Sequence, residues 1–277
     1  MKNKRKRIVT GISIVIIGFI AYIFLFGKLF PYSPIIIGFQ KHETNHTIIY
    51  IQKGADFTDF SSIDTLIPTV EGFHELEFLY KPKIFVFKDS ISYSRRSPSK
   101  ARFCVFYNSR LFISPWALQE AKNQKIDLAI YLTHELSHSL LHQHSGIINA
   151  PKYPKWLLEG IAVYSSNQMG TSFYPSKEGT YRLIKNGNYI PPQYFKTSNE
   201  DKVSLDVPNR IPFMYSEFAC IVDFLIEKYG KKKFLNYMKA LIEKPNHAEV
   251  FYQIYQIEFD AVISDFKQYA STYKANI

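Results

Sequence analysis

Cysteine is scarce in this chain of 277 residues, since only Cys104 and Cys220 occur. One possible pair over this length excludes the disulfide framework of a small secreted domain. Cys220 falls in an apolar helical pattern and is expected to be buried. No histidine lies near either thiol in the sequence, which argues against a thiol nucleophile. Internal repeats and low-complexity tracts are absent as well, so a repeat architecture is not indicated.

Acidic side chains are missing from the first 30 residues, which hold six of the basic ones. Subtracting these six from the formal net charge of +10 leaves +4 for residues 31–277. This balance describes a mildly basic surface and excludes the strong positive footprint of a nucleic-acid-binding protein. The densest basic run, residues 95–102, is expected to be a solvated loop.

A long uncharged stretch follows the basic residues at the N-terminus. Its length suffices to cross a bilayer as a helix, and the preceding lysines and arginines favour a cytoplasmic N-terminus. The predicted organisation is a cytoplasmic tail (1–7), a transmembrane anchor (8–30), a juxtamembrane linker (31–44) and an extracytoplasmic domain (45–277). A cleaved signal peptide is the alternative. It is less favoured because its apolar region is typically about 7–15 residues and ends in a small-residue site, which is not evident here.

The motif that carries chemistry is His134-Glu135-Leu136-Ser137-His138. On a helix, residues i and i+4 leave the same face, so both imidazoles can reach one metal ion. Glu135 can take a proton from a water in the open coordination position. Glu159, 21 residues after His138, can complete a His₂Glu zinc set. The apolar spacing over residues 127–141 predicts the helix, which Gly146 and Pro151 end, and a second helix after Pro154 carries Glu159.

The two segments together resemble the gluzincin (peptidase MA-like) zinc metallopeptidases. The resemblance rests on His134–His138 and on Trp156-Leu157-Leu158-Glu159-Gly160-Ile161-Ala162, and it covers roughly residues 45–272. It implies one zinc ion held by His134, His138 and Glu159, and a peptide or protein as substrate. It also implies that Tyr215, in Pro-Phe-Met-Tyr, stabilises the tetrahedral intermediate. The chain has no Gly-x-Met-x-Asn stretch, so the amine-binding site of true aminopeptidases is not indicated.

His144 and Tyr164 are alternative candidates for two of these roles. His144 stands where metzincins have a third zinc-binding histidine, but Leu141 replaces the glycine that would turn the chain back to the metal. Glu159 is therefore the preferred third ligand. Tyr164 is a weaker candidate than Tyr215 for stabilising the oxyanion.

The order of elements, strands first and helices after, predicts an α+β domain. By resemblance this is a thermolysin-like domain with a small mixed sheet, an active-site helix and then a helical lobe. The hairpin over 103–114 is the candidate edge that binds extended peptide, and the polar segment 169–211 is the candidate lid. The other elements predicted are strands at 47–51 and 83–87 and helices at 57–78, 215–229, 231–243 and 259–273.

These expectations combine into a membrane-anchored zinc metallopeptidase, an endopeptidase by preference, acting outside the cytoplasm. Glu135 is its general base on zinc-bound water. Its partners are a peptide or protein substrate and the membrane, with no nucleic acid. Two alternatives remain: a catalytically inactive gluzincin-like domain used for binding or assembly, and a cell-surface module in which the histidines are incidental.

Overall fold

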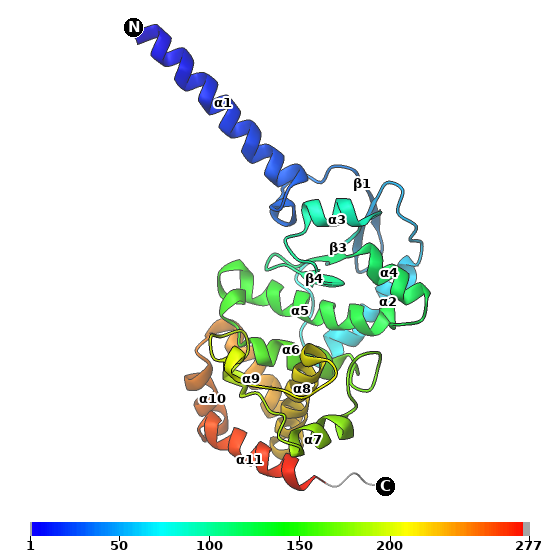
Figure 1. Ribbon diagram of the computed structural model, residues 1–277, viewed down its shortest axis with the longest axis vertical. Coiled ribbons are helices and arrows are strands. Elements are labelled where there is room, and N and C mark those ends of the chain that lie inside the picture. Colours follow the sequence, from blue (N-terminus) through cyan, green and yellow to red (C-terminus); the bar gives the residue numbers. More distant parts are fainter. Residues whose placement is uncertain (1, 274–277) are drawn as a thin grey trace.

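The computed structural model describes residues 2–273, and side chains from residue 6 onward. Part of the expected cytoplasmic tail and the last four residues of the chain therefore lie outside the described part. Helix α1 (Lys2–Phe26) projects alone from the body, and α11 (Phe259–Thr272) lies at the opposite end of the molecule (Figure 1). The segment Lys6–Phe26 of α1 is long and apolar enough to cross a membrane.

The sheet has five strands in the order β1-β2-β3-β5-β4. The strands are β1 (Phe39–Glu43), β2 (Ile48–Gln52), β3 (Lys83–Val86), β4 (Phe103–Val105) and β5 (Arg110–Ile113). The three central strands β2, β3 and β5 are parallel, and an antiparallel strand closes each edge. The predicted hairpin over 103–114 is confirmed, and β4 is an edge strand.

Helices make up the rest of the body, so the prediction of a mixed α+β fold with a small sheet is confirmed. They are α2 (Phe60–His74), α3 (Ser90–Arg96), α4 (Pro115–Lys122), α5 (Leu128–Asn149), α6 (Lys155–Ser165), α7 (Lys177–Lys185), α8 (Arg210–Tyr229), α9 (Lys231–Glu243), α10 (His247–Tyr255) and α11 (Phe259–Thr272). Single 3₁₀ turns lie at η1 (Phe30–Tyr32), η2 (Ala150–Lys152), η3 (Pro192–Tyr194) and η4 (Glu200–Lys202).

The two faces of the sheet bury different side chains because successive residues of a strand point to opposite faces. Ile84 and Val86 of β3 pack into an aliphatic core shared with α2 and α5. Phe85 of the same strand packs into an aromatic cluster with Phe112 and Phe30 on the other face. The sheet therefore holds α5 on one side and the segment that follows α1 on the other.

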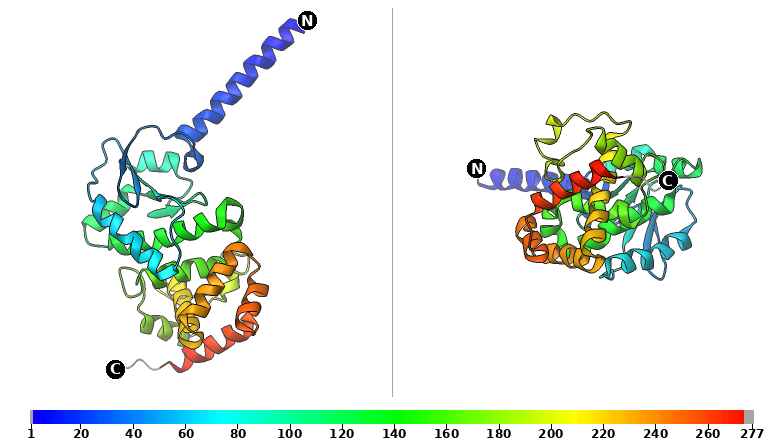
Figure 2. Two further views of the ribbon diagram at one scale, coloured as in Figure 1. Left: turned by 180° about the vertical axis from the view of Figure 1, so that it is seen from behind. Right: turned by 90° about the horizontal axis from the view of Figure 1, so that it is seen from below.

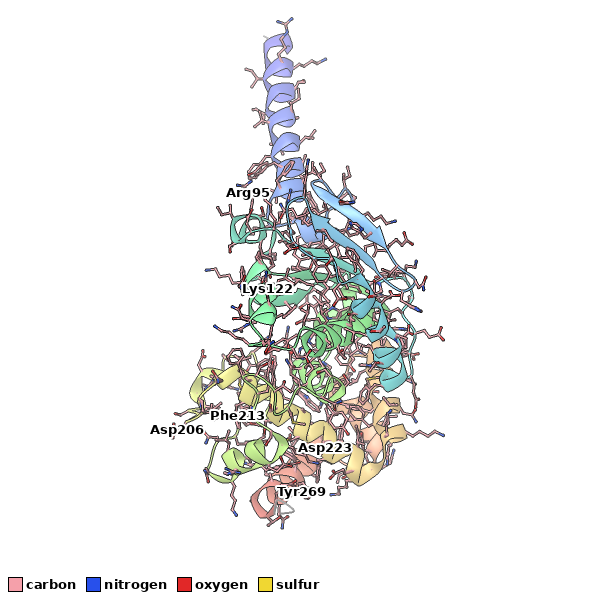
Figure 3. All side chains as sticks on the ribbon, turned by 90° about the vertical axis from the view of Figure 1, so that its right-hand side faces the viewer. Arg95, Lys122, Asp206, Phe213, Asp223 and Tyr269 are labelled. Atoms are coloured by element: carbon pink, nitrogen blue, oxygen red, sulfur yellow. The ribbon has the colours of Figure 1, made fainter. Side chains whose placement is uncertain are left out.

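A second core lies in the helical lobe formed by α6 to α11. Helix α6 packs against both α5 and α8, so it joins the rest of the lobe to α5 on the sheet. Figure 2 shows the layers from two further sides, and Figure 3 labels Phe213, Asp223 and Tyr269 within the lobe. The boundary between the two halves is where the candidate site residues meet.

Several expectations about the segments need correction. The segment 31–44 is not a linker. It contains β1, which pairs with β2 at every one of its residues, and the preceding Phe30 is fully buried. Arg96, expected in a solvated loop, is buried at the end of α3. Helix α8 begins at Arg210, before the expected start at Tyr215.

Candidate metal centre

The two histidines of the motif lie side by side on α5. Asp127 caps this helix by accepting hydrogen bonds from the backbone amides of Ala129 and Ile130, which fixes its first turn. His134 and His138 are buried on the face that meets α6, and their Nε2 atoms are 3.0 Å apart. The helix kinks at Gly146, where φ is +67°, close to the end predicted from the sequence.

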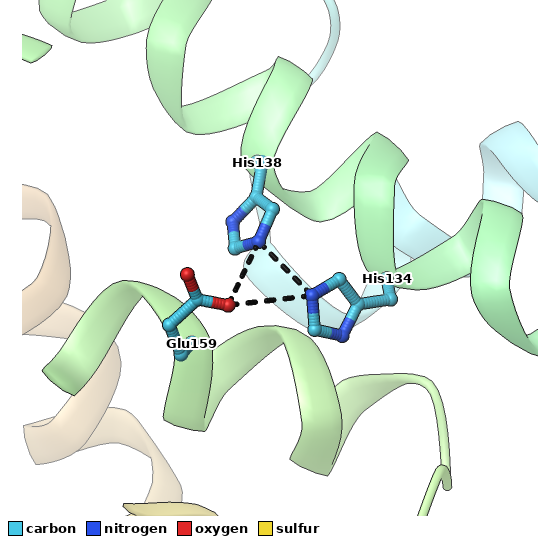
Figure 4. Close-up of side chains that lie close together, drawn as sticks. All are labelled: His134, His138 and Glu159. Carbon is cyan, nitrogen blue, oxygen red and sulfur yellow. Dashed lines mark hydrogen bonds and ion pairs between the residues drawn. The ribbon is translucent and has the colours of Figure 1, made fainter. Parts of the chain in front are cut away.

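Glu159 approaches the histidines from α6. Its Oε2 atom lies 3.5 Å from Nε2 of His134 and 3.3 Å from Nε2 of His138 (Figure 4). The next residue explains how α6 can lie so deep. A Cβ atom on Gly160 would stand 2.7 Å from the backbone oxygen of Phe218 on α8, a separation that real side chains do not show. The glycine therefore permits the close crossing of α6 and α8.

These three atoms fit a zinc ion by type and by spacing. Tetrahedral zinc with bonds of about 2.0–2.2 Å to nitrogen and oxygen separates neighbouring ligand atoms by about 3.3–3.6 Å. The three observed separations lie between 3.0 and 3.5 Å. Two imidazole nitrogens and one carboxylate oxygen are a known zinc set that leaves a fourth position open. The cluster can accept the ion with little rearrangement.

The electrostatics of the cluster also suit a cation. Burial alone would raise the pKa of the Glu159 carboxyl, but His138 and His134 lower it overall, so the carboxylate remains charged. Burial opposes the charged form of His138, but the pKa of this imidazole is raised overall by the charge of Glu159. A buried, negatively charged carboxylate thus lies beside two imidazole nitrogen atoms that can coordinate a metal ion.

Gln168 fixes the orientation of one histidine. Its Oε1 atom lies 2.8 Å from Nδ1 of His134, and because an amide oxygen only accepts, Nδ1 carries the proton. The lone pair of His134 is then on Nε2, which faces the cluster. Gln168 is fully buried just after α6. Sequence reasoning missed this residue, because no motif spacing marks it.

Glu135 lies on the wall of a cavity of about 640 Å³ that also exposes His134, His138 and Glu159. The surrounding protein removes water from its carboxyl group, and this burial raises the pKa of Glu135. A carboxyl group with a raised pKa is a better proton acceptor than an ordinary glutamate. The structure therefore brings the expected general base and the three expected ligands to one cavity.

Tyr215 reaches the same cavity from the second turn of α8. Its ring stacks on His134 with 6.3 Å between ring centroids. Burial and the charge of Glu159 hold the pKa of its hydroxyl well above the usual range, so it remains a proton donor. Tyr174, which was not predicted, lines the cavity too, and burial likewise raises its pKa. Tyr164 packs on Phe73 in a separate hollow.

The other histidines of α5 do not join the cluster. The Nε2 atom of His144 lies 2.8 Å from the backbone oxygen of Glu77, so the metzincin-like ligand set is wrong. His142 lines the cavity, with its Nδ1 atom 3.2 Å from the backbone oxygen of Phe106. Cys104 and Cys220 are both free thiols.

Strand β4 runs along the cavity. All three of its residues line the wall, together with Arg102 before it and Phe106 after it. As the last strand in the sheet order, β4 pairs with β5 on one side, and no strand among residues 2–273 pairs with its other side. An edge strand of this kind can bind an extended peptide through backbone hydrogen bonds.

Comparisons with known proteins found few similarities. No protein-family model matches the chain, and no curated protein matches its sequence. Among solved structures, the chain is similar to an M1 zinc metallopeptidase from Deinococcus radiodurans, with a TM-score of 0.44 and 9% sequence identity. The match covers 84% of this chain and 50% of that one, so this chain spans half the length of that protein.

Proposed function

We propose that this protein is a membrane-anchored zinc peptidase that hydrolyses peptide bonds outside the cytoplasm. The observation that carries the proposal is the convergence of Nε2 of His134, Nε2 of His138 and Oε2 of Glu159 to within 3.0–3.5 Å of one another. Glu135 and the edge strand β4 lie on the same cavity. A general base, a metal set and a peptide-binding edge together match the needs of amide hydrolysis.

The chemistry divides among a few side chains. Zinc, when bound by His134, His138 and Glu159, polarises a carbonyl group and lowers the pKa of water. Glu135 takes a proton from the attacking water and passes it to the nitrogen of the leaving amine as the C–N bond breaks. The hydroxyl of Tyr215 donates a hydrogen bond to the oxygen that becomes negative on the attacked carbonyl carbon. Burial of Glu135, which raises the pKa of its carboxyl, supports the first of these roles.

Substrate binding is assigned to β4. An extended chain added beside Phe103–Val105 would pair its backbone with unpaired groups of this edge and cross the cavity in front of Glu135. Because backbone groups are common to all peptides, this contact provides affinity with little dependence on sequence. We place the cleavage within a chain, because the sequence has no Gly-x-Met-x-Asn stretch of the kind that binds a free amino terminus.

The anchor is assigned to α1. None of the residues in its segment Lys6–Phe26 is buried, and basic residues come first in the chain, which favours an N-terminus in the cytoplasm. The structure also supports an anchor that stays attached. Phe30, four residues after the helix, is fully buried in the aromatic cluster, so a cut there would fall at the start of the folded body.

The first test is the metal content of the full chain in detergent, by elemental mass spectrometry. We expect about one zinc per chain, lost in His138→Ala and retained in His144→Ala, which removes a histidine of the same helix outside the cluster. No zinc after reconstitution would exclude the peptidase. Zinc binding without cleavage of a random peptide library would favour an inactive binding domain. Cleavage that Glu135→Gln leaves unchanged would not come from this site, so it would favour the same alternative.

A further inference from the structure

The junction between α1 and the folded body contains no flexible tether. Helix α1 ends at Phe26, and backbone hydrogen bonds continue from Gly27 to Ile23 and from Phe30 to Gly27, each at 3.0 Å. Phe30 then opens η1 and has no exposed surface. The candidate membrane span therefore passes into the protein core within four residues.

Contacts between side chains and the folded body restrain this junction. The buried guanidinium of Arg96 lies over three aromatic rings, at 5.6 Å from Phe26, 5.0 Å from Phe30 and 5.4 Å from Phe39. It thereby joins the last residue of α1 to the core. Lys28 donates a hydrogen bond of 2.8 Å to the backbone oxygen of Ser97. These contacts fix the direction in which α1 leaves the body.

The same junction forms part of the cavity wall. Tyr32, the last residue of η1, lines the cavity and packs edge-on against Phe106 with 6.2 Å between ring centroids. Asn108 donates a hydrogen bond of 2.7 Å to the backbone oxygen of Pro31, which ties η1 to the β4–β5 turn. Pro98, next to the lysine-bound Ser97, also lines the cavity.

Chain length limits how far the cavity can lie from the bilayer. Tyr32 follows Phe26 by six residues, which span at most about 20 Å even when fully extended. An extended substrate crosses the same distance with about six residues. Leu29, Ile35 and Ile37 are exposed apolar side chains around the point where α1 leaves the body, and such side chains suit the edge of a bilayer. Figures 1 and 2 show α1 leaving from the sheet half of the body, opposite the helical lobe.

We infer that the substrates are themselves membrane-anchored chains, and that the protein cuts them within roughly a dozen residues of their anchor. The inference rests on the proposed peptidase function. A rigid junction keeps the cavity at one height, so a substrate segment near the bilayer is presented at high effective concentration and a distant one is not. The class of substrate is thus set by distance from the membrane, while β4 contributes little sequence preference.

The test uses the full chain in lipid vesicles with an anchored substrate. The substrate is one apolar span followed by several identical copies of a short segment, chosen from a peptide library as one that the detergent-solubilised protein cleaves. Because the copies are chemically identical, only distance differs among them. Mass spectrometry of the products should place cuts in the copy nearest the membrane at least about tenfold more often than in the farthest. Equal cutting of all copies would overturn the inference.

An insertion variant tests whether the rigid junction causes the preference for copies near the membrane. A Gly/Ser linker of about 20 residues between Gly27 and Lys28 removes the hydrogen bond from Phe30 to Gly27. It leaves the side-chain contacts of Phe30 and Tyr32 in place, but the distance of the body from the bilayer is no longer fixed. We expect cuts to spread to distant copies, with an unchanged rate on free peptide. The same linker between Asn123 and Gln124, at an exposed turn after α4, should leave the pattern as in the parent. Preference for the near copy that persists after the first insertion would contradict the inference.

The two proposals fail in different ways. If the free segment in detergent is not cleaved in a Glu135-dependent manner, the peptidase function fails. If the free segment is cleaved normally and the anchored copies are cut without regard to distance, only the inference about substrates fails.

Discussion

The Nδ1 atom of His134 donates its hydrogen to Oε1 of Gln168 across 2.8 Å, entirely inside the protein. The amide thereby selects the tautomer of His134 that leaves Nε2 free to bind a metal. A partner of this kind also restrains the ring, so less ordering is needed when the ion arrives.

Replacing this amide should therefore weaken metal binding without removing a ligand. For Gln168→Ala we expect zinc affinity to fall about 10–100-fold, measured by competition with a chelator. Gln143→Ala is the matched control, because Gln143 is a buried amide on α5 whose side chain hydrogen-bonds to the backbone of Tyr80 and not to the histidine cluster. Its loss should lower stability but leave the affinity unchanged. Equal affinities in the parent and Gln168→Ala would show that the contact does not position His134.

Glu135→Gln should separate chemistry from metal binding. The amide keeps the shape of the side chain but cannot accept a proton, so peptide cleavage should fall about 10²–10⁴-fold. Zinc content should stay as in the parent, since Glu135 is not in the ligand cluster. Glu243→Gln, an exposed glutamate at the end of α9, serves as the control and should be fully active. Loss of zinc in Glu135→Gln would mean that the residue has a structural role.

Tyr215→Phe tests the proposed oxyanion contact. Removing the hydroxyl should lower kcat about 10²-fold or more with little change in KM, because the contact forms chiefly in the transition state. The ring that stacks on His134 is retained, so zinc content should not change. Tyr164→Phe should be indistinguishable from the parent, because Tyr164 lies in a different hollow. An unaffected kcat in Tyr215→Phe would leave Tyr174 as the tyrosine to test next.

Gly160→Ala should destabilise the fold through the crossing of α6 and α8. The added Cβ would lie 2.7 Å from the backbone oxygen of Phe218, so the two helices must move apart, at about 1–3 kcal/mol of unfolding free energy. Gly72→Ala in α2 is the opposite case, because a Cβ there meets no atom within 4 Å. It should stabilise by about 0.4–1 kcal/mol through the entropy of the unfolded chain. Urea unfolding would measure both, and similar effects of the two changes would contradict the packing argument.

Acid should destabilise the protein through two buried neutral histidines outside the cavity. Burial lowers the pKa of His74 and of His247 to about 4. Between about pH 6.5 and 4 the unfolded state therefore binds more protons than the folded state, so stability falls as pH falls, by at most about 1.4 kcal/mol per pH unit for each histidine. His247→Gln should flatten this slope in urea unfolding measured at pH 7 and pH 5. A variant with the slope of the parent would exclude His247 as a contributor.

Local patterns predicted the parts that depend on neighbours in the sequence. The i, i+4 spacing of His134 and His138 places them on one face of any helix, and the surrounding apolar residues favour that helix over a loop. The hairpin at β4 and β5 and the long apolar α1 were predicted for the same reason. The strand β1 was missed because its sequence, Phe-Gln-Lys-His-Glu, is mostly polar, and its pairing with β2 supplies what its own residues do not.

The sequence by itself determined the two histidines on one helical face, the glutamate in a following helix and an apolar segment long enough for a membrane. Only the tertiary structure decided that Gln168 lies behind His134, that α6 crosses α8 closely enough at Gly160 to bring Glu159 to the histidines, and that Arg96 and Tyr32 join α1 to the cavity. The physical reason is that helix periodicity and hydropathy act over a few residues. Contacts between distant segments depend instead on how whole helices and strands pack, and no local pattern encodes that packing.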